Sequence, residues 1–271
     1  MAERDPDYAL GDSSRELERL IEQSRFFGEL TRKVFAEAGL SPGMRVLDVG
    51  CGPGDVSFLA ASLVGPDGEV VGIDRSSAAV DAARGRAAGL SNIRFLAGDA
   101  RELASEGVFD AVIGRLVLMY FADPAQALRT FAAHVRPGGL IVFHEFVASR
   151  SESSPKCDVV EQALGWIRHA LAFTGANFDM GYGLFSAFVN AGLPAPELRM
   201  EARIGGGPEY QGYRTIAEVV RTLTPVIEKA GLATAAEIDI DTLEERMRSA
   251  VVSAGAVLIS PPFVGAWARK P

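Results

Sequence analysis

The chain has 271 residues, 48% of them hydrophobic and 23% charged, which is the balance of a folded protein with a large core rather than of a disordered chain. The formal net charge is -8, so nucleic acid and anionic membrane surfaces are poor candidates for the main partner. The two cysteines lie far apart, no apolar run is long enough to cross a membrane, and the polar N-terminus is unlike a signal peptide, so we expect a cytoplasmic protein without a metal site.

The first predicted element is a helix over residues 13–40, where apolar side chains recur at helical spacing and where Gly28 marks a point of division into two helices. From residue 44 onward, short apolar runs alternate with helical segments. We expect strands at residues 45–49, 69–74, 92–96, 109–113 and 139–146. Strands separated by helices predict an α/β fold, in which a doubly wound, mostly parallel sheet is covered on both faces.

Beyond residue 149 the alternation ends and helices predominate. We expect helices at residues 155–173, 182–191, 213–229 and 241–253, and strands at 197–204 and 256–269. The last of these strands contains Pro261-Pro262, which must produce a bulge or a break. The predicted organisation is an N-terminal helical lid (1–40), a core that binds the ligand (41–150), and helical cap elements with C-terminal strands that complete the same sheet (151–271).

The most informative motif follows the first strand and has the sequence Asp48-Val49-Gly50-Cys51-Gly52-Pro53-Gly54-Asp55. In a doubly wound sheet this strand-to-helix turn binds a nucleotide-like ligand, and glycines let that ligand approach the backbone. A dinucleotide fingerprint needs a glycine where Asp55 stands, and a carboxylate there would repel a pyrophosphate. Asp48 and Asp55 therefore favour the cationic S-adenosylmethionine over NAD. The structural alternative is a tight glycine turn in which Asp55 caps a helix.

Two further acids end the next two strands. Asp74 follows the second strand, where a carboxylate can accept both hydroxyls of a ribose. Asp99 follows the third strand, where it could accept from an adenine amino group while the Ala100 backbone N–H donates to the ring. For both acids the alternative role is that of a helix cap. Asp110 begins the fourth strand, at the opposite edge of the sheet, and is expected to be structural.

Taken together, the segments VLDVGCGPG, VVGID, FLAGDA, FDAVIGRLVLMYFADP and HVRPGG resemble the motifs of the class I S-adenosylmethionine-dependent methyltransferases, in their usual order. The resemblance covers roughly residues 44 to 146. It implies a Rossmann-like sheet of seven strands with the last strand antiparallel, a helical cap, and a methyl donor bound along the ends of strands one, two and four. S-adenosylhomocysteine would be the product.

The resemblance also implies which residues bind the donor. Most of them follow the strand ends, and two belong to the N-terminal lid, which resembles the lids of small-molecule members. The implied set is Gly50, Gly52 and Gly54 for the methionine part, Asp74 for the ribose, Asp99 and Ala100 for the adenine, Arg115 and Leu116 for the reactive end, and Tyr8 and Gln23 for closure over the donor. Asp48 and Arg75 complete the set of expected donor-binding residues.

Candidates for catalysis stand near the end of the fifth strand and on the first cap helix. Methyl transfer needs a base only when the acceptor must lose a proton. His144 and Glu145 end the fifth strand with side chains on opposite faces, so we expect one of them to meet the pocket. His169 shares a helical face with Trp166 and Phe173, and this face could line an aromatic acceptor pocket. The alternative is that all three candidates are structural.

We expect the chain to methylate a small, hydrophobic or aromatic metabolite such as a phenol, a quinone or a polyketide-like ring, by in-line displacement. The alternative function is a protein that binds S-adenosylmethionine without transferring its methyl group. No nucleic acid or membrane partner is expected, and either a monomer or a homodimer is compatible with the sequence. Nothing in the sequence identifies the acceptor atom as oxygen, nitrogen or carbon.

Overall fold

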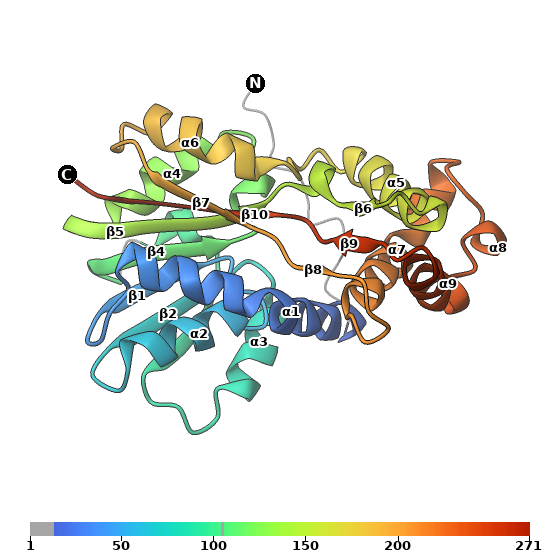
Figure 1. Ribbon diagram of the computed structural model, residues 1–271. Coiled ribbons are helices and arrows are strands. Elements are labelled where there is room, and N and C mark those ends of the chain that lie inside the picture. The colour runs from blue at the N-terminus through green and yellow to red at the C-terminus, as the bar shows by residue number, and fades with distance from the viewer. Residues whose placement is uncertain (1–13, 104–105) are drawn as a thin grey trace.

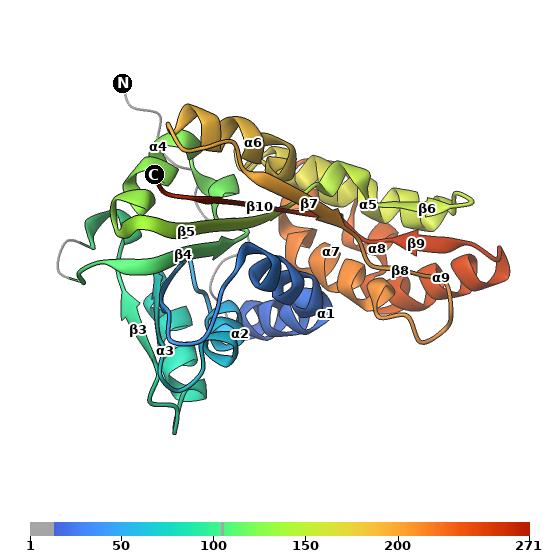
Figure 2. The ribbon, with the colours of Figure 1, turned by 60° about the vertical axis from the view of Figure 1, so that its left-hand side comes forward.

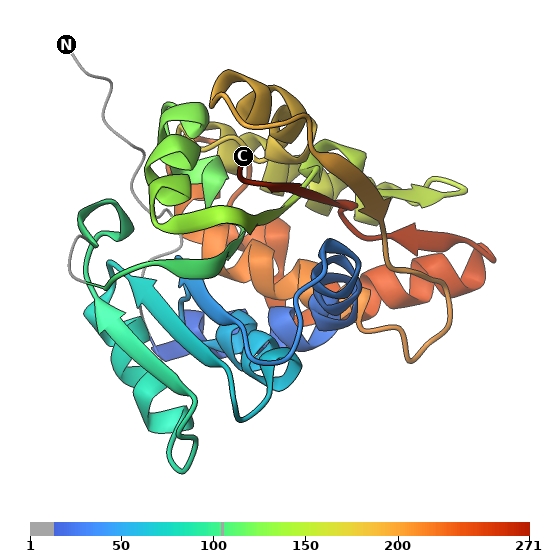
Figure 3. The same cartoon turned by 90° about the vertical axis from the view of Figure 1, so that its left-hand side faces the viewer.

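The computed structural model describes residues 14–103 and 106–271. Figure 1 shows a central sheet with helices on both faces and a mainly helical cap beyond one end of its strands. Two runs of helices cover the sheet: α2 (Asp55–Val64) and α3 (Ser77–Arg86) lie on one face, with α4 (Pro124–Ala133) and α6 (Met180–Asn190) on the other. Figure 3 looks along the molecule from the end opposite the cap and shows these two helical layers around the strands.

The central sheet has seven strands in the order β3-β2-β1-β4-β5-β10-β7. Their bounds are β1 Arg45–Val49, β2 Glu69–Asp74, β3 Ile93–Ala97, β4 Phe109–Arg115, β5 Val135–Phe146, β7 Glu197–Glu201 and β10 Phe263–Arg269. Strands β1 to β5 pair in parallel, and β10 is antiparallel to both β5 and β7. The doubly wound α/β sheet of seven strands, with the last strand of the chain antiparallel, is thereby confirmed.

The sheet is buried on both faces because its strands carry apolar side chains in both directions. In β1, Leu47 and Val49 pack with α4 and α6, whereas Val46 packs with the helices of the opposite face. All three side chains are fully buried. This is the pattern of a parallel sheet covered by helices, where continuous apolar runs replace alternation. The two helical layers therefore hold the carboxyl ends of β1, β2 and β4 in fixed positions.

The first helix, α1 (Ser14–Ala38), is continuous, so the expected division at Gly28 is wrong. A Cβ at Gly28 would meet nothing within 4 Å, and one glycine does not break a helix that tertiary contacts support. The C-terminal half packs on the sheet, where Phe27 contacts Phe263 of β10 with ring centroids 4.7 Å apart. The N-terminal half extends to α7, as Figure 2 shows. Tyr8, the other expected lid residue, lies outside the described residues.

The cap contains α5 (Asp158–Ala172), α7 (Gly212–Lys229), the short α8 (Ala235–Ile238) and α9 (Ile240–Ser253), which share a core of their own. It also contains a three-stranded sheet that the sequence did not predict, in the order β6-β9-β8. Its strands are β6 (Glu152–Ser154), β9 (Val257–Ile259) and β8 (Ile204–Gly205). These strands are too short to show a periodicity in the sequence.

Two predicted strands are each divided between the two sheets. The expected strand 197–204 becomes β7 in the large sheet and β8 in the small one, and the expected strand 256–269 becomes β9 and β10. In the second case the break falls at Pro261-Pro262, as predicted. The chain thus crosses twice between the sheet and the cap, which ties the cap to the sheet. Among the described residues, no helix is long and apolar enough to span a membrane.

The close contact between α1 and β10 gives a test of this packing. A Cβ at Gly265 would lie 2.6 Å from the Val34 methyl groups, so Gly265→Ala should push α1 away from the sheet. We expect the free energy of unfolding to fall by about 1–3 kcal/mol, the usual cost of overpacking. Chemical denaturation monitored by circular dichroism measures it. The matched variant Gly28→Ala, in open space on the same helix, should raise stability by about 0.5–1 kcal/mol. Equal effects of the two variants would contradict this packing.

Candidate active site

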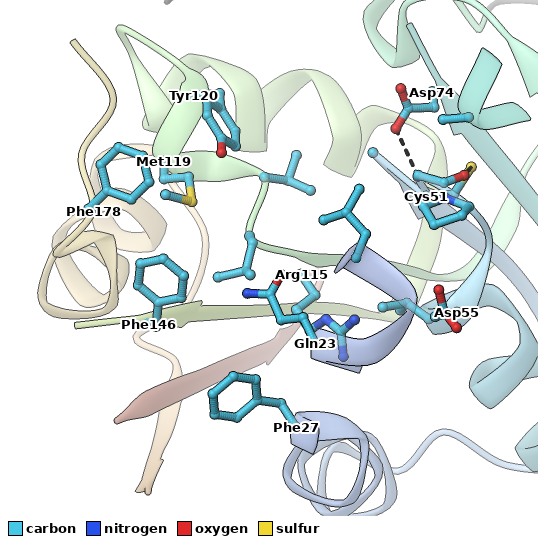
Figure 4. A pocket seen from close by; sticks show the side chains of 18 of the residues that line it. Gln23, Phe27, Cys51, Asp55, Asp74, Arg115, Met119, Tyr120, Phe146 and Phe178 are labelled. Carbon is cyan, nitrogen blue, oxygen red and sulfur yellow. Dashed lines mark hydrogen bonds between the residues drawn. The ribbon is translucent and has the colours of Figure 1, made fainter. Parts of the chain in front are cut away.

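A cavity of about 680 Å3 lies between the carboxyl ends of the parallel strands, α1 and the cap. One end, the loop end, is lined by Gly50, Gly52, Asp74 and Asp99 at the strand ends. The other, the apolar end, is lined by side chains from the turn after β4 and from the cap, including Met119, Tyr120, Phe146, Leu164, Ile167, Leu171, Phe178, Ile216 and Val219. Figure 4 shows the Asp74 side and the aromatic side facing each other, with Gln23 and Arg115 between them. The volume is typical of a small-molecule site.

The three glycines of the loop have left-handed backbones but different neighbours. Their φ angles are 65° at Gly50, 51° at Gly52 and 92° at Gly54. A Cβ at Gly50 would stand 2.6 Å from Val117, and one at Gly54 would stand 2.9 Å from Phe95. A Cβ at Gly52 would meet nothing within 4 Å, although Gly52 lines the cavity. Gly50 and Gly54 are therefore required by packing, whereas Gly52 leaves room for a ligand at the backbone.

Asp74 holds this loop in shape. One carboxylate oxygen accepts the Gly52 backbone N–H and the other accepts the Ser76 N–H, both at 2.8 Å. The cap of α3 is Ser76, whose hydroxyl accepts the Ala79 N–H, so Asp74 is not the helix cap that was its alternative role. Each carboxylate oxygen can accept a second hydrogen bond. Asp74 lines the cavity and remains able to bind a pair of hydroxyls there.

Asp99 does cap the short 3-10 turn η1 (Ala100–Glu102), where it accepts the Arg101 N–H. It also forms ion pairs with the Arg101 and Arg75 side chains, at 2.6 and 3.2 Å. The Arg101 hydrogen bond is the main cause that lowers the pKa of Asp99 to about 2. Asp99, Ala100 and Arg75 all line the cavity, so the three predicted residues lie together at its loop end. The binding of adenine by Asp99 stays a prediction.

Asp48 and Asp55, at the two ends of the glycine loop, do not present free negative charges to the cavity as the sequence suggested. Asp55 lines the cavity but pairs with Arg86 at 2.7 Å, so its negative charge is largely offset. Asp48 is 1% exposed and lies outside the cavity wall, where it accepts a 2.5 Å hydrogen bond from the Ser57 hydroxyl. Burial raises the pKa of Asp48 to about 7. The nearby Arg115 charge opposes this rise. Gly54 also lies outside the wall, behind the loop.

At the end of β4, Arg115 joins the sheet to α1. Its guanidinium donates to the Ser24 hydroxyl at 2.9 Å and to the Thr31 hydroxyl at 3.2 Å. The next residue, Leu116, has a left-handed backbone with φ 58°, a strained conformation for a leucine. Its N–H donates to the His144 carbonyl oxygen at 3.0 Å. Both Arg115 and Leu116 line the cavity, and Figure 4 shows Arg115 between its two ends.

The structure places His144 and Glu145 behind the cavity wall, so the expectation that one of them meets the pocket is not supported by their positions. His144 is 1% exposed, with Nδ1 3.2 Å from the Thr31 hydroxyl, and burial lowers its pKa to about 3. Glu145 is fully buried, and one of its oxygens accepts the Val117 and Leu118 N–H groups at 2.9 and 2.8 Å. Burial raises the pKa of Glu145 to about 8. Glu145 therefore shapes the turn after β4.

His169 lies on the exposed face of α5, where Nδ1 is 2.8 Å from the Gly165 carbonyl oxygen. The predicted face does not line the cavity, because Trp166 packs in the cap core and Phe173 is 69% exposed. The cavity is instead lined by the neighbouring stripe of α5, which consists of Leu164, Ile167, Arg168 and Leu171. Helical spacing identified the helix but not which of its faces is turned toward the strand ends.

One polar feature of the cavity was missed in the sequence. Arg19 and Glu16 of α1 are both buried and form a two-fold ion pair, with both nitrogen–oxygen distances 2.7 Å. A third Arg19 nitrogen donates to the Gln23 side-chain oxygen at 3.2 Å. Arg19 and Gln23 line the cavity, so the N-terminal half of α1 presents polar groups to it. The sequence signal for this ion pair was the three-residue spacing of Glu16 and Arg19 on the apolar face of a predicted helix.

Comparison with known proteins gives partial matches in sequence and a nearly full match in fold. A family model described as a methyltransferase domain matches residues 40–178. The demethylmenaquinone methyltransferase of Staphylococcus aureus is 35% identical over 112 residues, 41% of this chain and 46% of that protein. An uncharacterised 37.1 kDa protein in transposon TN4556 of Streptomyces fradiae is 42% identical over 38% of this chain and 30% of its own length. The chain therefore matches less than half of each of these curated relatives.

A solved structure extends the similarity of fold to the cap. A candidate methyltransferase from Bacillus halodurans superposes with a TM-score of 0.58 over 89% of this chain and 98% of that one. The two sequences are 17% identical, so this similarity concerns the fold alone.

The open space at Gly52 predicts that a methyl group there blocks ligand binding more than it unfolds the protein. Gly52→Ala should weaken S-adenosylhomocysteine binding at least tenfold, about 1.4 kcal/mol, because the added Cβ would enter the cavity. Isothermal titration calorimetry measures it. The control is Gly43→Ala, which is also left-handed (φ 81°) with open space but lies outside the cavity wall. Both variants should lose about 1–2 kcal/mol of stability. Unchanged affinity in Gly52→Ala would exclude close approach of the ligand here.

Buried Glu145 predicts a pH-dependent stability. Its pKa is 4.5 in an unfolded reference and about 8 in the folded protein, so between these values the folded state holds the extra proton. This contribution therefore makes stability fall as pH rises from about 5 to 8. Glu145→Gln keeps the acceptor oxygen and removes the titration, so it should gain on the order of a few kcal/mol relative to wild type over this range. Urea denaturation at several pH values measures it, with exposed Glu29→Gln as control. Parallel pH profiles would show that Glu145 is ionised when folded.

Proposed function

Because the chain belongs to the class I S-adenosylmethionine-dependent methyltransferase family, we propose that it transfers the methyl group of S-adenosylmethionine to a small apolar or aromatic acceptor. The observation that carries this proposal is one cavity that contains both the loop end and the apolar end, with Arg115 between them. A donor at one end and an acceptor at the other would then share one cavity. The relative named demethylmenaquinone methyltransferase supports a quinone-like ring as one acceptor class.

The loop end offers side-chain and backbone groups that can bind the donor. Gly52 leaves space at the backbone, Asp74 offers two carboxylate oxygens for a ribose, and Ala100 lines the cavity next to Asp99, where its backbone N–H would donate to an adenine ring. The donor, when bound, supplies a methyl group that its sulfonium has already activated for displacement. The buried Asp48 lies beneath the loop and adds partial negative potential on the side where that cation would be held.

The apolar end suits an aromatic acceptor. Phe146 and Phe178 stack with ring centroids 6.1 Å apart, and Tyr120 meets Phe178 edge to face at 6.3 Å. Such rings bind flat apolar molecules through area burial and quadrupole contacts. Burial raises the pKa of Tyr120, so its hydroxyl stays protonated at neutral pH.

Catalysis in this site rests on positioning. The described residues that line the apolar end include no histidine and no carboxylate, so they offer no general base at neutral pH. The chain would instead hold the acceptor in line with the methyl group and exclude water, and positioning of this kind lowers barriers by several kcal/mol. An acceptor that arrives with its nucleophilic atom already ionised, or that needs no deprotonation, fits such a site.

The functional test uses methyl-labelled S-adenosylmethionine with metabolite extracts and a panel of phenols and quinols, and identifies products by mass. We expect labelled product together with S-adenosylhomocysteine. Tight donor binding with no product across the extracts would favour the alternative, a donor-binding protein without transfer. A failure of the folded protein to bind S-adenosylhomocysteine would reject both functions.

The role of Asp74 can be tested by a near-isosteric change. Asp74→Asn removes the charge and one acceptor oxygen, so it should lose a ribose contact and weaken the Gly52 loop. We expect S-adenosylhomocysteine affinity to fall at least tenfold, since hydrogen bonds to a charged group contribute about 1.5–3 kcal/mol. Calorimetry measures the affinity, and thermal unfolding checks the fold. The control is Asp67→Asn, an exposed acid in the turn before β2. A similar affinity in both variants would rule out the ribose role.

A further inference from the structure

We infer that the acceptor carries an anionic oxygen group, a carboxylate or an ionised enol or phenol, and that Arg168 of α5 binds it. This inference rests on the proposed function and narrows its substrate class to apolar molecules with an acidic group. Arg168 lines the apolar end of the cavity within a stripe that is otherwise apolar, formed with Leu164, Ile167 and Leu171. A charged side chain within an apolar stripe is normally paired with a group of opposite charge when it is buried.

The other arginines of the cavity wall already have partners. Arg19 is paired with Glu16, Arg75 is paired with Asp99, and Arg115 donates to two hydroxyls of α1. Arg168 makes no hydrogen bond and no ion pair with any residue in the described ranges 14–103 and 106–271. It is half-buried and lines the cavity, so an acceptor that fills the apolar end would displace water from its side chain.

Desolvation explains why this arrangement would select an anion. A neutral apolar acceptor that fills the cavity would strip water from Arg168 and leave a guanidinium unpaired, which is costly in a weakly polar environment. An acceptor with a carboxylate would replace the lost water with two parallel N–H···O hydrogen bonds, because the guanidinium fork matches a carboxylate. Arg168 would thus favour acidic acceptors over their neutral isosteres.

The charged residues around the apolar end also favour an anionic acceptor. Its described lining residues include no carboxylate that would repel an anion. The nearest buried acids are compensated: Glu16 is paired with Arg19, and burial raises the pKa of Glu145 so that it stays largely protonated at neutral pH. The acids of the wall, Asp55, Asp74 and Asp99, belong to the loop end.

The test uses two fluorescent probes with the same aromatic body, anilinonaphthalene sulfonate and its uncharged counterpart N-phenylnaphthylamine. Each is titrated into the protein loaded with S-adenosylhomocysteine. Wild type should bind the sulfonate more tightly than the neutral probe. Arg168→Met should lower the affinity for the sulfonate about tenfold and leave that for the neutral probe unchanged, whereas Arg168→Lys should retain part of the preference. Lys156→Met, an exposed change next to the same helix with the same loss of charge, is the control.

The outcomes separate this inference from the proposed function. Retained sulfonate affinity in Arg168→Met, equal losses in Lys156→Met, or no sulfonate binding by wild type would each overturn the role of Arg168. Loss of S-adenosylhomocysteine binding in Arg168→Met, with its thermal unfolding unchanged, would instead assign Arg168 to the donor and also overturn it. Failure of wild type to bind S-adenosylhomocysteine would be a failure of the proposed function, and it is measured separately.

Discussion

The hydrogen bond from the Gly52 backbone N–H to the Asp74 carboxylate, 2.8 Å long, joins the ends of β1 and β2 and determines the shape of the loop end. A second carboxylate acts in the same way across the cavity, where Glu145 accepts two N–H groups of the turn after β4. Turns at the ends of parallel strands leave N–H groups without ladder partners, and buried N–H groups must be paired. The glycine loop and the turn after β4 are therefore both held by carboxyl groups from neighbouring strands.

The core of the fold was predictable because its signals are local. Apolar runs separated by helical segments identified β1 to β5, and Pro261-Pro262 predicted the break between β9 and β10. The small sheet of the cap was not predictable, because β6, β8 and β9 are two or three residues long and are defined by their pairing with distant segments. The division of residues 197–204 between two sheets has the same cause.

The sequence predicted which strand ends and helices form the candidate site, but it did not predict which of their side chains line the cavity. It placed Gly52, Asp74, Arg115 and Gln23 at strand ends or on α1, and the structure brings them to one cavity. It could not show that His144 and Glu145 both lie outside the cavity wall, because β5 is buried on both sides where they lie. It also could not show the Asp55–Arg86 pair, because the two residues are 31 positions apart and meet only through the packing of α2 and α3.

The cavity combines opposite charges at its two ends, and this has a consequence for how the reactants would be arranged. The loop end contains Asp74 with the buried Asp48 behind it, which favours a cation, while the apolar end contains Arg168 and no described carboxylate, which favours an anion. Reversed binding would place the donor's sulfonium nearer Arg168 and the acidic acceptor nearer Asp74, and both placements would be less favourable. The proposed charges would therefore disfavour the reversed arrangement. An acceptor whose ionised oxygen is itself the methylated atom would also need no base, and the described wall of the apolar end provides none.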